Sequence, residues 1–214
     1  MERIQQSLLA GVEKRVLIWM AKRLPGWINA DHLTVLGFGS MIGASIFYAA
    51  ADKWPAALLL VNVCLAINWF GDSMDGTVAR VREQQRPNYG YYVDHIVDAL
   101  SALFLFAGLA LSGYMHERVA VGMLLCYLLL GINSYLATHS LGVFQISWWK
   151  FSPTEMRILL AAGNIVAFFK PYVLGGKYLF FDLAGAIAIL CMAVVLAASV
   201  AKNTLTLYHR ERIG

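Results

Sequence analysis

The chain has 214 residues, of which 59% are hydrophobic and 14% are charged, and its mean hydropathy is +0.62. Because soluble domains carry about 25% charged residues, this composition excludes a soluble globular protein and predicts an all-α integral membrane protein. The net charge of +4 does not indicate a nucleic-acid partner, since the basic residues cluster beside apolar runs, where anionic headgroups attract them. We therefore expect membrane lipid, and no nucleic acid, around this protein.

The N-terminal residues 3–24 predict an amphipathic helix that lies in the membrane interface. Its apolar residues recur at helical spacing and are interleaved with basic ones, namely Arg3, Lys14, Arg15, Lys22 and Arg23. Such a helix buries its apolar face among the lipids and keeps its basic face among the headgroups. Pro25 and Gly26 are expected to end it.

Six apolar runs follow and predict six transmembrane helices, because a backbone inside lipid must satisfy its own hydrogen bonds. The predicted spans cover residues 33–51, 55–82, 89–113, 119–140, 153–169 and 179–201. Residues 202–214 are predicted to form a polar tail. No change in composition divides the chain, so we expect one membrane domain over residues 1–214.

Two of the predicted spans carry recognisable start signals. Asp31 is expected to cap the first span, with Thr34 in its first turn, and capping alone would account for both residues. Ser152 is expected to cap the fifth span, with Pro153 at its first helical position. The first span also has glycines that allow a neighbouring helix to pack closely: Gly37, Gly39 and Gly43.

The distribution of basic residues predicts the orientation in the inner (cytoplasmic) membrane. If the N-terminus is cytoplasmic, the segments on that side hold 13 of the 17 Lys and Arg residues. The positive-inside rule therefore places both termini in the cytoplasm, together with the turn between the second and third spans.

That turn and the helix ends beside it carry four carboxylates: Asp72, Asp75, Asp94 and Asp98. Spacings of three and four residues place each pair on one face of a helix. Carboxylates this close repel one another, and one or two divalent cations are the simplest means of keeping them ionised. Oxygen ligands alone favour Mg²⁺, with Mn²⁺ as the alternative. The other interpretation is two helix ends with solvated acids.

The full pattern here is D-x2-D-G-x2-A-R-x9-G-x3-D-x3-D, and it resembles the signature of the CDP-alcohol phosphotransferase family. All eight fixed positions of that signature are filled: Asp72, Asp75, Gly76, Ala79, Arg80, Gly90, Asp94 and Asp98. The resemblance implies a membrane enzyme of phospholipid synthesis that moves a substituted phosphate from a CDP-linked donor to an alcohol hydroxyl. It also implies two bound metal ions, release of CMP and a homodimer.

The resemblance assigns roles to individual residues. It implies that the metal ions are held by Asp72, Asp75, Asp94 and Asp98, and that Asp98 also deprotonates the acceptor hydroxyl. It places around the cytidine diphosphate Asp72, Gly76, Ala79, Arg80 and Gly90. A partial match to the family's Pro-Asn-x-Leu-Thr element adds Asp31 and Thr34 to the donor site. From the residues alone, Gly76 is equally a packing glycine, and Arg80 pairs with either a phosphate or an aspartate.

The sequence leaves two substrate classes open. One uses CDP-diacylglycerol and a polar alcohol, and a phosphorylated acceptor would need cations such as Lys150 and Arg157, unless these are ordinary cytoplasmic charges. The other uses CDP-choline or CDP-ethanolamine with diacylglycerol. Its Asp-His pairing and its stretch around the fifth span are similar to this sequence and would place His95 and Glu155 at the acceptor, with His95 as the rival base. The short chain favours the first class.

A membrane transporter of divalent cations is the alternative from another functional class, because it too needs an acidic site. Two observations weigh against it. The four aspartates lie at one end of their spans instead of midway, and a transporter leaves the Gly-Ala-Arg pattern of residues 76–80 unexplained.

Overall fold

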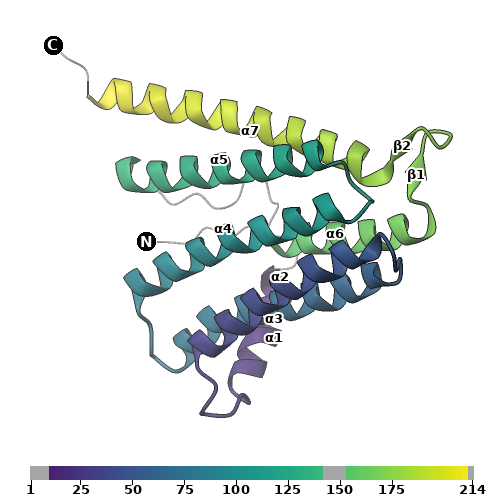
Figure 1. The fold of residues 1–214 in the computed structure, drawn as a ribbon. Coiled ribbons are helices and arrows are strands. Elements are labelled where there is room, and N and C mark those ends of the chain that lie inside the picture. The colour runs from purple at the N-terminus through teal and green to yellow at the C-terminus, as the bar shows by residue number, and fades with distance from the viewer. Residues whose placement is uncertain (1–9, 142–152, 212–214) are drawn as a thin grey trace.

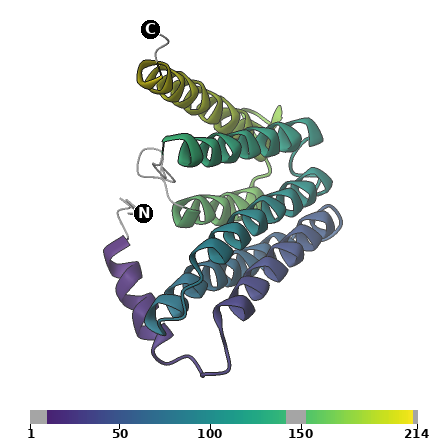
Figure 2. The same ribbon diagram turned by 90° about the vertical axis from the view of Figure 1, so that its left-hand side faces the viewer.

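The computed structural model describes residues 10–141 and 153–211. In this part of the chain the helices are α1 (Ala10–Ala21), α2 (Ala30–Ala51), α3 (Ala57–Val81), α4 (Pro87–Leu111), α5 (Glu117–Leu141), α6 (Pro153–Phe169) and α7 (Phe180–Arg210). Two short strands, β1 (Tyr172–Val173) and β2 (Tyr178–Leu179), form an antiparallel hairpin between α6 and α7. Helices α2 to α7 run in alternating directions (Figure 1), and α1 crosses their direction (Figure 2).

Among residues 10–141 and 153–211, five helices are long and apolar enough to cross a membrane: α2, α3, α4, α5 and α7. The helical integral membrane fold expected from the sequence is thus confirmed. The fifth predicted span, residues 153–169, corresponds to α6, which has 17 residues. That length gives about 26 Å of helix, slightly less than the roughly 30 Å of a hydrocarbon core. The count of six complete spans is therefore not confirmed in full.

Two predicted boundaries are wrong. The polar tail was expected from residue 202, but α7 continues to Arg210 as one helix of 31 residues. No glycine or proline interrupts residues 202–210, and the Thr206 hydroxyl donates to the Lys202 carbonyl one turn earlier, 2.8 Å away. At the start of α2, Asn29 and not Asp31 is the cap. Its side chain accepts from the backbone N–H of His32 at 3.0 Å.

Helix α2 lies between α3 and α4 and contacts both through glycines. A Cβ atom added at Gly71 of α3 would lie 2.6 Å from the Leu33 carbonyl oxygen and 2.8 Å from the Gly37 Cα of α2. On the other side, a Cβ added at Gly108 of α4 would lie 2.6 Å from the Ser45 Cα. The backbones approach this closely only because these positions lack side chains. Gly71 therefore brings the carboxylate-bearing half of α3 against α2, and Gly108 brings the opposite end of α4 against the same helix.

The predicted N-terminal helix is present as α1, of which the described part begins at Ala10. Leu17 and Ala21 on its inner face are buried against Met74 and Val78 of α3. Trp19 on the opposite face is exposed. Apolar contact with α3 thus holds α1 beside the end of the bundle where the α3–α4 turn lies (Figure 2).

The hairpin between α6 and α7 was not foreseen in the sequence. Its strands have only two residues each, and its turn contains three consecutive residues with positive φ: Leu174, Gly175 and Gly176. The hairpin lies at the opposite end of the bundle from the α3–α4 turn (Figure 1). It therefore has no part in the site described below.

The glycine contact between α2 and α3 makes a testable prediction for stability. Gly71→Ala forces a methyl group into backbone atoms of α2, which cannot move unless the helices separate. We expect a loss of about 1–3 kcal/mol, seen as a lower melting temperature in detergent.

Gly39→Ala is the matched control, because Gly39 lies in α2 with no atom within 4 Å of its added Cβ. Gly39 was expected to allow close helix packing, but it makes no such contact with the described residues of this chain. We expect Gly39→Ala to melt at or above the wild-type temperature, since alanine favours a helix over glycine by about 1 kcal/mol. Equal changes for the two variants would contradict the proposed contact.

Candidate active site

The four aspartates of the sequence motif line one small cavity. Asp72 and Asp75 come from α3, Asp94 and Asp98 come from α4, and Thr34 of α2 lies between the two pairs. The cavity has a volume of about 10 Å³, close to the space that one water molecule needs. The spacings of three and four residues thus place both pairs toward a common point.

Two of these carboxylates accept hydrogen bonds from specific protein donors. The Thr34 hydroxyl donates to Asp75 Oδ2 at 2.7 Å, and the backbone N–H of Gly76 donates to Asp75 Oδ1. Arg157 Nη2 donates to Asp72 Oδ2, also at 2.7 Å. Thr34 therefore does more than stand in the first turn of α2, because it fixes the orientation of Asp75.

Arg157 of α6 binds two side chains of α3. Its Nη2 binds Asp72, and its Nε donates to the side-chain oxygen of Asn68 at 2.8 Å. Asn68 is buried and donates in turn to the Gly37 carbonyl of α2 at 3.0 Å. A guanidinium suits this position because its donors are planar and fixed in direction. Asn68 was not identified from the sequence, although it lies one helical turn before Asp72.

The carboxylates and Arg157 form one electrostatic group. Asp98 interacts with the charges of Asp72, Asp75, Asp94 and Arg157. Such charges interact strongly because the surrounding helices exclude water. The guanidinium of Arg157 offsets part of the repulsion among the four carboxylates.

The donor set of this cavity fits a hard divalent cation, since it offers carboxylate oxygens from two adjacent helices. As placed, no group of three or more His, Cys, Asp or Glu side chains among residues 10–141 and 153–211 is arranged to hold an ion. Asp72 is turned toward Arg157, and Asp75 toward Thr34. Because a carboxylate has several acceptor sites, these donors can orient Asp72 and Asp75 while other lone pairs bind an ion.

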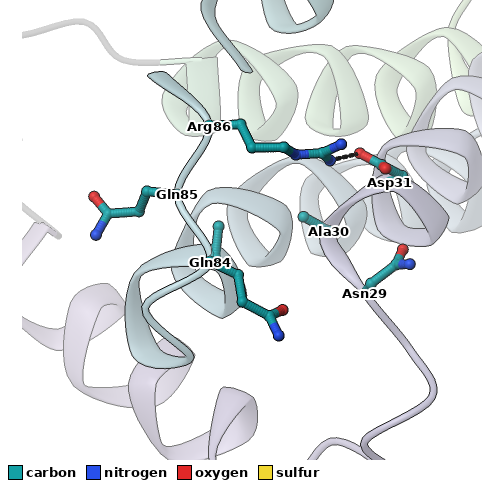
Figure 3. Close-up of a pocket in the computed structure, with 7 residues that line it drawn as sticks. Asn29, Ala30, Asp31, Gln84, Gln85 and Arg86 are labelled. Atoms are coloured by element: carbon teal, nitrogen blue, oxygen red, sulfur yellow. Dashed lines mark hydrogen bonds and ion pairs between the residues drawn. The ribbon is translucent and has the colours of Figure 1, made fainter. Parts of the chain in front are cut away.

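A larger pocket of about 390 Å³ lies beside the start of α2 and the turn after α3. Figure 3 shows its polar lining, with Arg86 facing Asp31 across the pocket as an ion pair. Arg86 also lies over the ring of Tyr89, with 4.1 Å between the guanidinium carbon and the ring centroid. Two residues of its lining, Asp31 and Ala79, were expected at the donor. Five others were not: Asn29, Ala30, Gln84, Gln85 and Arg86.

The remaining glycines and the arginine of the motif lie outside the lining of that pocket. Arg80 Nη2 donates to the Thr77 hydroxyl at 3.2 Å. A Cβ atom added at Gly76 would lie 3.2 Å from Arg80 Nη1, so Gly76 leaves room for that guanidinium. Around Gly90 no atom lies within 4 Å of an added Cβ. Gly90 thus keeps the first turn of α4 open.

His95 lies in an aromatic cluster on the side of α4 that faces α5. Its ring centroid is 4.2 Å from that of Tyr91 and 4.9 Å from that of Tyr135 in α5. His95 Nδ1 lies 2.6 Å from the Tyr91 carbonyl oxygen, which can only accept, so Nδ1 donates to it. Tyr135 was not identified from the sequence, because no local pattern relates it to the motif.

Of the other residues expected at the acceptor, the structure describes Glu155 and Arg157 but not Lys150. Glu155 lies in the first turn of α6, two residues before Arg157. Lys150 and Ser152 lie outside the described residues. Arg157, expected at the acceptor or as an ordinary cytoplasmic charge, binds Asp72, which lines the cavity.

Comparison with known proteins agrees with this arrangement. The family model described as CDP-alcohol phosphatidyltransferase matches residues 27–201, which is most of the chain and includes all four aspartates. The chain belongs to the CDP-alcohol phosphatidyltransferase family. The matched region covers α2 to α6 and most of α7, and it leaves out α1.

Two curated proteins are similar in sequence to parts of this chain. Archaetidylinositol phosphate synthase from Pyrococcus horikoshii is 27% identical over 113 residues, which are 53% of this chain and 53% of that protein. CDP-diacylglycerol–serine O-phosphatidyltransferase from Encephalitozoon cuniculi is 29% identical over 124 residues, 56% of this chain and 32% of that protein. The matches thus span about half or less of the relatives' own lengths.

The pairing of Arg157 with Asp72 can be measured by a double-mutant cycle of thermal stability. Asp72→Asn and Arg157→Met are made singly and together. Because a hydrogen bond to a charged group contributes about 1.5–3 kcal/mol, we expect a coupling energy of that size.

The ion pair of Asp31 with Arg86 is the matched control, because its side chains are 44% and 51% exposed. Exposed pairs contribute about 1 kcal/mol or less. A coupling for Arg157 and Asp72 no greater than that of the exposed pair would contradict their placement in the cavity.

Proposed function

We propose that this protein transfers a phosphatidyl-type group from CDP-diacylglycerol to the hydroxyl of a polar alcohol, with release of CMP. The observation that carries the proposal is the convergence of Asp72, Asp75, Asp94 and Asp98 on one cavity at the end of a membrane bundle. The bundle gives a lipid-linked substrate access to the site from the bilayer. The Encephalitozoon relative is named as a transferase that uses CDP-diacylglycerol, which supports this class for the present chain.

The reaction is an in-line displacement at phosphorus with no covalent enzyme intermediate. The acceptor oxygen forms a bond to the phosphorus that carries the lipid. The bond from this phosphorus to the oxygen of CMP breaks, and CMP leaves with that oxygen. The hydroxyl proton passes to a carboxylate of the site, which we assign to Asp98. His95 is the rival base, with Nε2 as its accepting atom.

We propose that Asp72, Asp75, Asp94 and Asp98 hold two Mg²⁺ ions, with Mn²⁺ as the alternative. When bound, these ions supply charge neutralisation at the pyrophosphate and a lower pKa for the acceptor hydroxyl. The protein's own contribution is orientation. Thr34 holds Asp75 in place, and Arg157 with Asn68 holds Asp72.

The pocket of about 390 Å³ is proposed to take the nucleotide part of the donor. Its size and its amide and carboxylate groups suit a polar base and sugar. Ala79 connects it to the motif, and Arg80 lies one residue further along α3, where the diphosphate would pass. The orientation that places this pocket in the cytoplasm, where nucleotide-linked donors are made, rests on the distribution of basic residues.

The acceptor is proposed to enter between α4, α5 and α6, where His95, Tyr135 and Arg157 lie. We also assign Glu155, in the first turn of α6, to the acceptor site. Lys150 is assigned to it because it precedes α6 by only three residues in the sequence. The alternative reaction uses CDP-choline or CDP-ethanolamine as donor and diacylglycerol as acceptor. The Asp-His pairing at residues 94 and 95 supports this alternative. We also propose a homodimer, for which the family resemblance is the support.

A panel of donors and acceptors tests the proposal directly. The purified protein is given CDP-diacylglycerol with serine, glycerol phosphate or inositol phosphate, and CDP-choline with diacylglycerol. CMP and lipid product are measured. CMP release from CDP-diacylglycerol with one polar alcohol is the expected result. No CMP from any donor, together with uptake of divalent cations into liposomes, would establish the transporter alternative.

Asp98→Asn is expected to lower turnover by about 10²–10⁴-fold, the usual contribution of a general base, while the donor still binds. Turnover and donor affinity are measured separately. Glu117→Gln is the control, because Glu117 is exposed at the far end of the bundle. His95→Ala decides between the two bases. A wild-type rate for Asp98→Asn, with a loss of the same size for His95→Ala, would move the base to His95.

Metal dependence is expected in stability as well as in turnover. Chelation should abolish CMP release, and Mg²⁺ should restore it. A ligand present at 100 times its dissociation constant stabilises the folded state by about 2.7 kcal/mol, so Mg²⁺ should raise the melting temperature. Asp75→Asn and Asp94→Asn should each reduce this shift. An unchanged shift in both variants would remove these carboxylates from the metal site.

A further inference from the structure

One carboxylate of α1 joins two helices of the site. Glu13 Oε1 accepts a hydrogen bond from Trp69 Nε1 of α3 at 2.8 Å and another from the Thr154 hydroxyl of α6 at 3.0 Å. All three side chains are partly buried. Glu13 stands outside the family motif and outside the cavity of the four aspartates.

The two residues that Glu13 binds lie close in sequence to Asn68 and to Arg157. Trp69 follows Asn68 directly in α3, and Thr154 precedes Arg157 by three residues in α6. Positions three apart lie on one face of a helix, so Thr154 and Arg157 face α3 together. The bonds of Glu13 therefore join α3 to α6 one turn away from the contacts of Arg157 with Asn68 and Asp72.

The deeper part of the same α6 face is joined to the bundle by a separate polar network. Asn62 of α3 donates to the Ala161 carbonyl at 3.2 Å and accepts from Asn164 at 2.7 Å. The Tyr48 hydroxyl of α2 donates to Asn164, also at 2.7 Å. Hydrogen bonds between helices inside a membrane fix their register. This network holds α6 from Ala161 onward, but its first turn depends on other contacts.

The first turn of α6 needs hydrogen bonds to neighbouring helices, because the end of a helix frays unless its groups find partners. Glu13 can supply them because α1 is itself fixed. Leu17 and Ala21, one and two turns after Glu13, are buried against α3. The carboxylate therefore has a defined place from which to hold Thr154.

We propose that Glu13 is a positioning residue of the active site. By holding the first turn of α6 against α3, it keeps Arg157 on Asp72 and shapes the side of the site where the acceptor enters. The kinetic part of this inference rests on the proposed function. Its structural part, the dependence of the Arg157–Asp72 pairing on Glu13, does not.

The test compares Glu13→Ala with Glu13→Gln. Glutamine keeps the Oε1 acceptor and loses the charge, so it should retain the bonds to Trp69 and Thr154. We expect Glu13→Ala to lower kcat/KM for the acceptor about tenfold, the order expected for losing hydrogen bonds to a charged group, with the donor KM within about twofold of wild type. Glu13→Gln should stay within about threefold of wild type, and the exposed neighbour Lys14→Ala should be unchanged.

Thr154→Val supplies the second arm, because it removes the hydroxyl and keeps the shape. It should lower the same acceptor parameter, and adding it to Glu13→Ala should cause no further loss. Equal losses for Glu13→Gln and Glu13→Ala, fully additive effects of Glu13→Ala and Thr154→Val, or equal changes for donor and acceptor would each overturn the proposal.

A third arm measures stability and needs no turnover. The double-mutant cycle of Asp72 and Arg157 is repeated in the Glu13→Ala and Glu13→Gln backgrounds. We expect the coupling to fall by half or more with alanine and to persist with glutamine. An undiminished coupling with alanine would overturn the inference. If the wild-type protein releases no CMP from any donor, the proposed function fails, and this arm still decides whether Glu13 positions Arg157.

Discussion

The structure depends on the placement of charge inside a bundle of apolar helices. Asp72, Asp75, Asp94 and Asp98 line one cavity, and Arg157 reaches in from α6 to bind Asp72. Charges in a medium of low dielectric repel or attract strongly, so this group is stable only when its donors are held at fixed positions. The polar contacts among α1, α2, α3 and α6 follow from this requirement.

Close packing of α2 makes the charge cluster possible. Gly71 and Gly108 let α3 and α4 approach α2 until backbone atoms are in contact. A larger residue at Gly71 would separate α3 from α2 next to Asp72, whereas Gly108 lies at the other end of α4 from Asp94 and Asp98. The close approach at Gly71 also lets Thr34 of α2 lie 2.7 Å from Asp75. Gly71 therefore helps to set the geometry of the site although none of its atoms takes part in the proposed chemistry.

Features that depend on local sequence could be predicted, and contacts between distant segments could not. The apolar runs predict helices because a backbone inside lipid must satisfy its own hydrogen bonds. The motif spacing predicts that each pair of aspartates lies on one face of its helix. The pairing of Arg157 with Asp72 joins residues 85 positions apart, and no periodicity relates them. Asn29 and Asp31 are equally good capping residues and lie two positions apart, so the sequence alone does not decide which of them caps α2. The end of α7 was missed because helix propensity continues after hydrophobicity stops.

The division between predictable and unpredictable residues matches a division within the proposed site. The donor side is built from α2, α3 and α4, which are consecutive in the chain and carry the motif. The acceptor side is built from α5 and α6, through Tyr135 and Arg157, which stand outside it. A motif confined to two consecutive helices therefore fixes the phosphoryl chemistry and leaves the choice of alcohol to helices that arrive later. In the proposed mechanism, acceptor choice depends on the register of α6 against α3, to which the hydrogen bonds of Glu13 and Asn164 contribute near the two ends of α6.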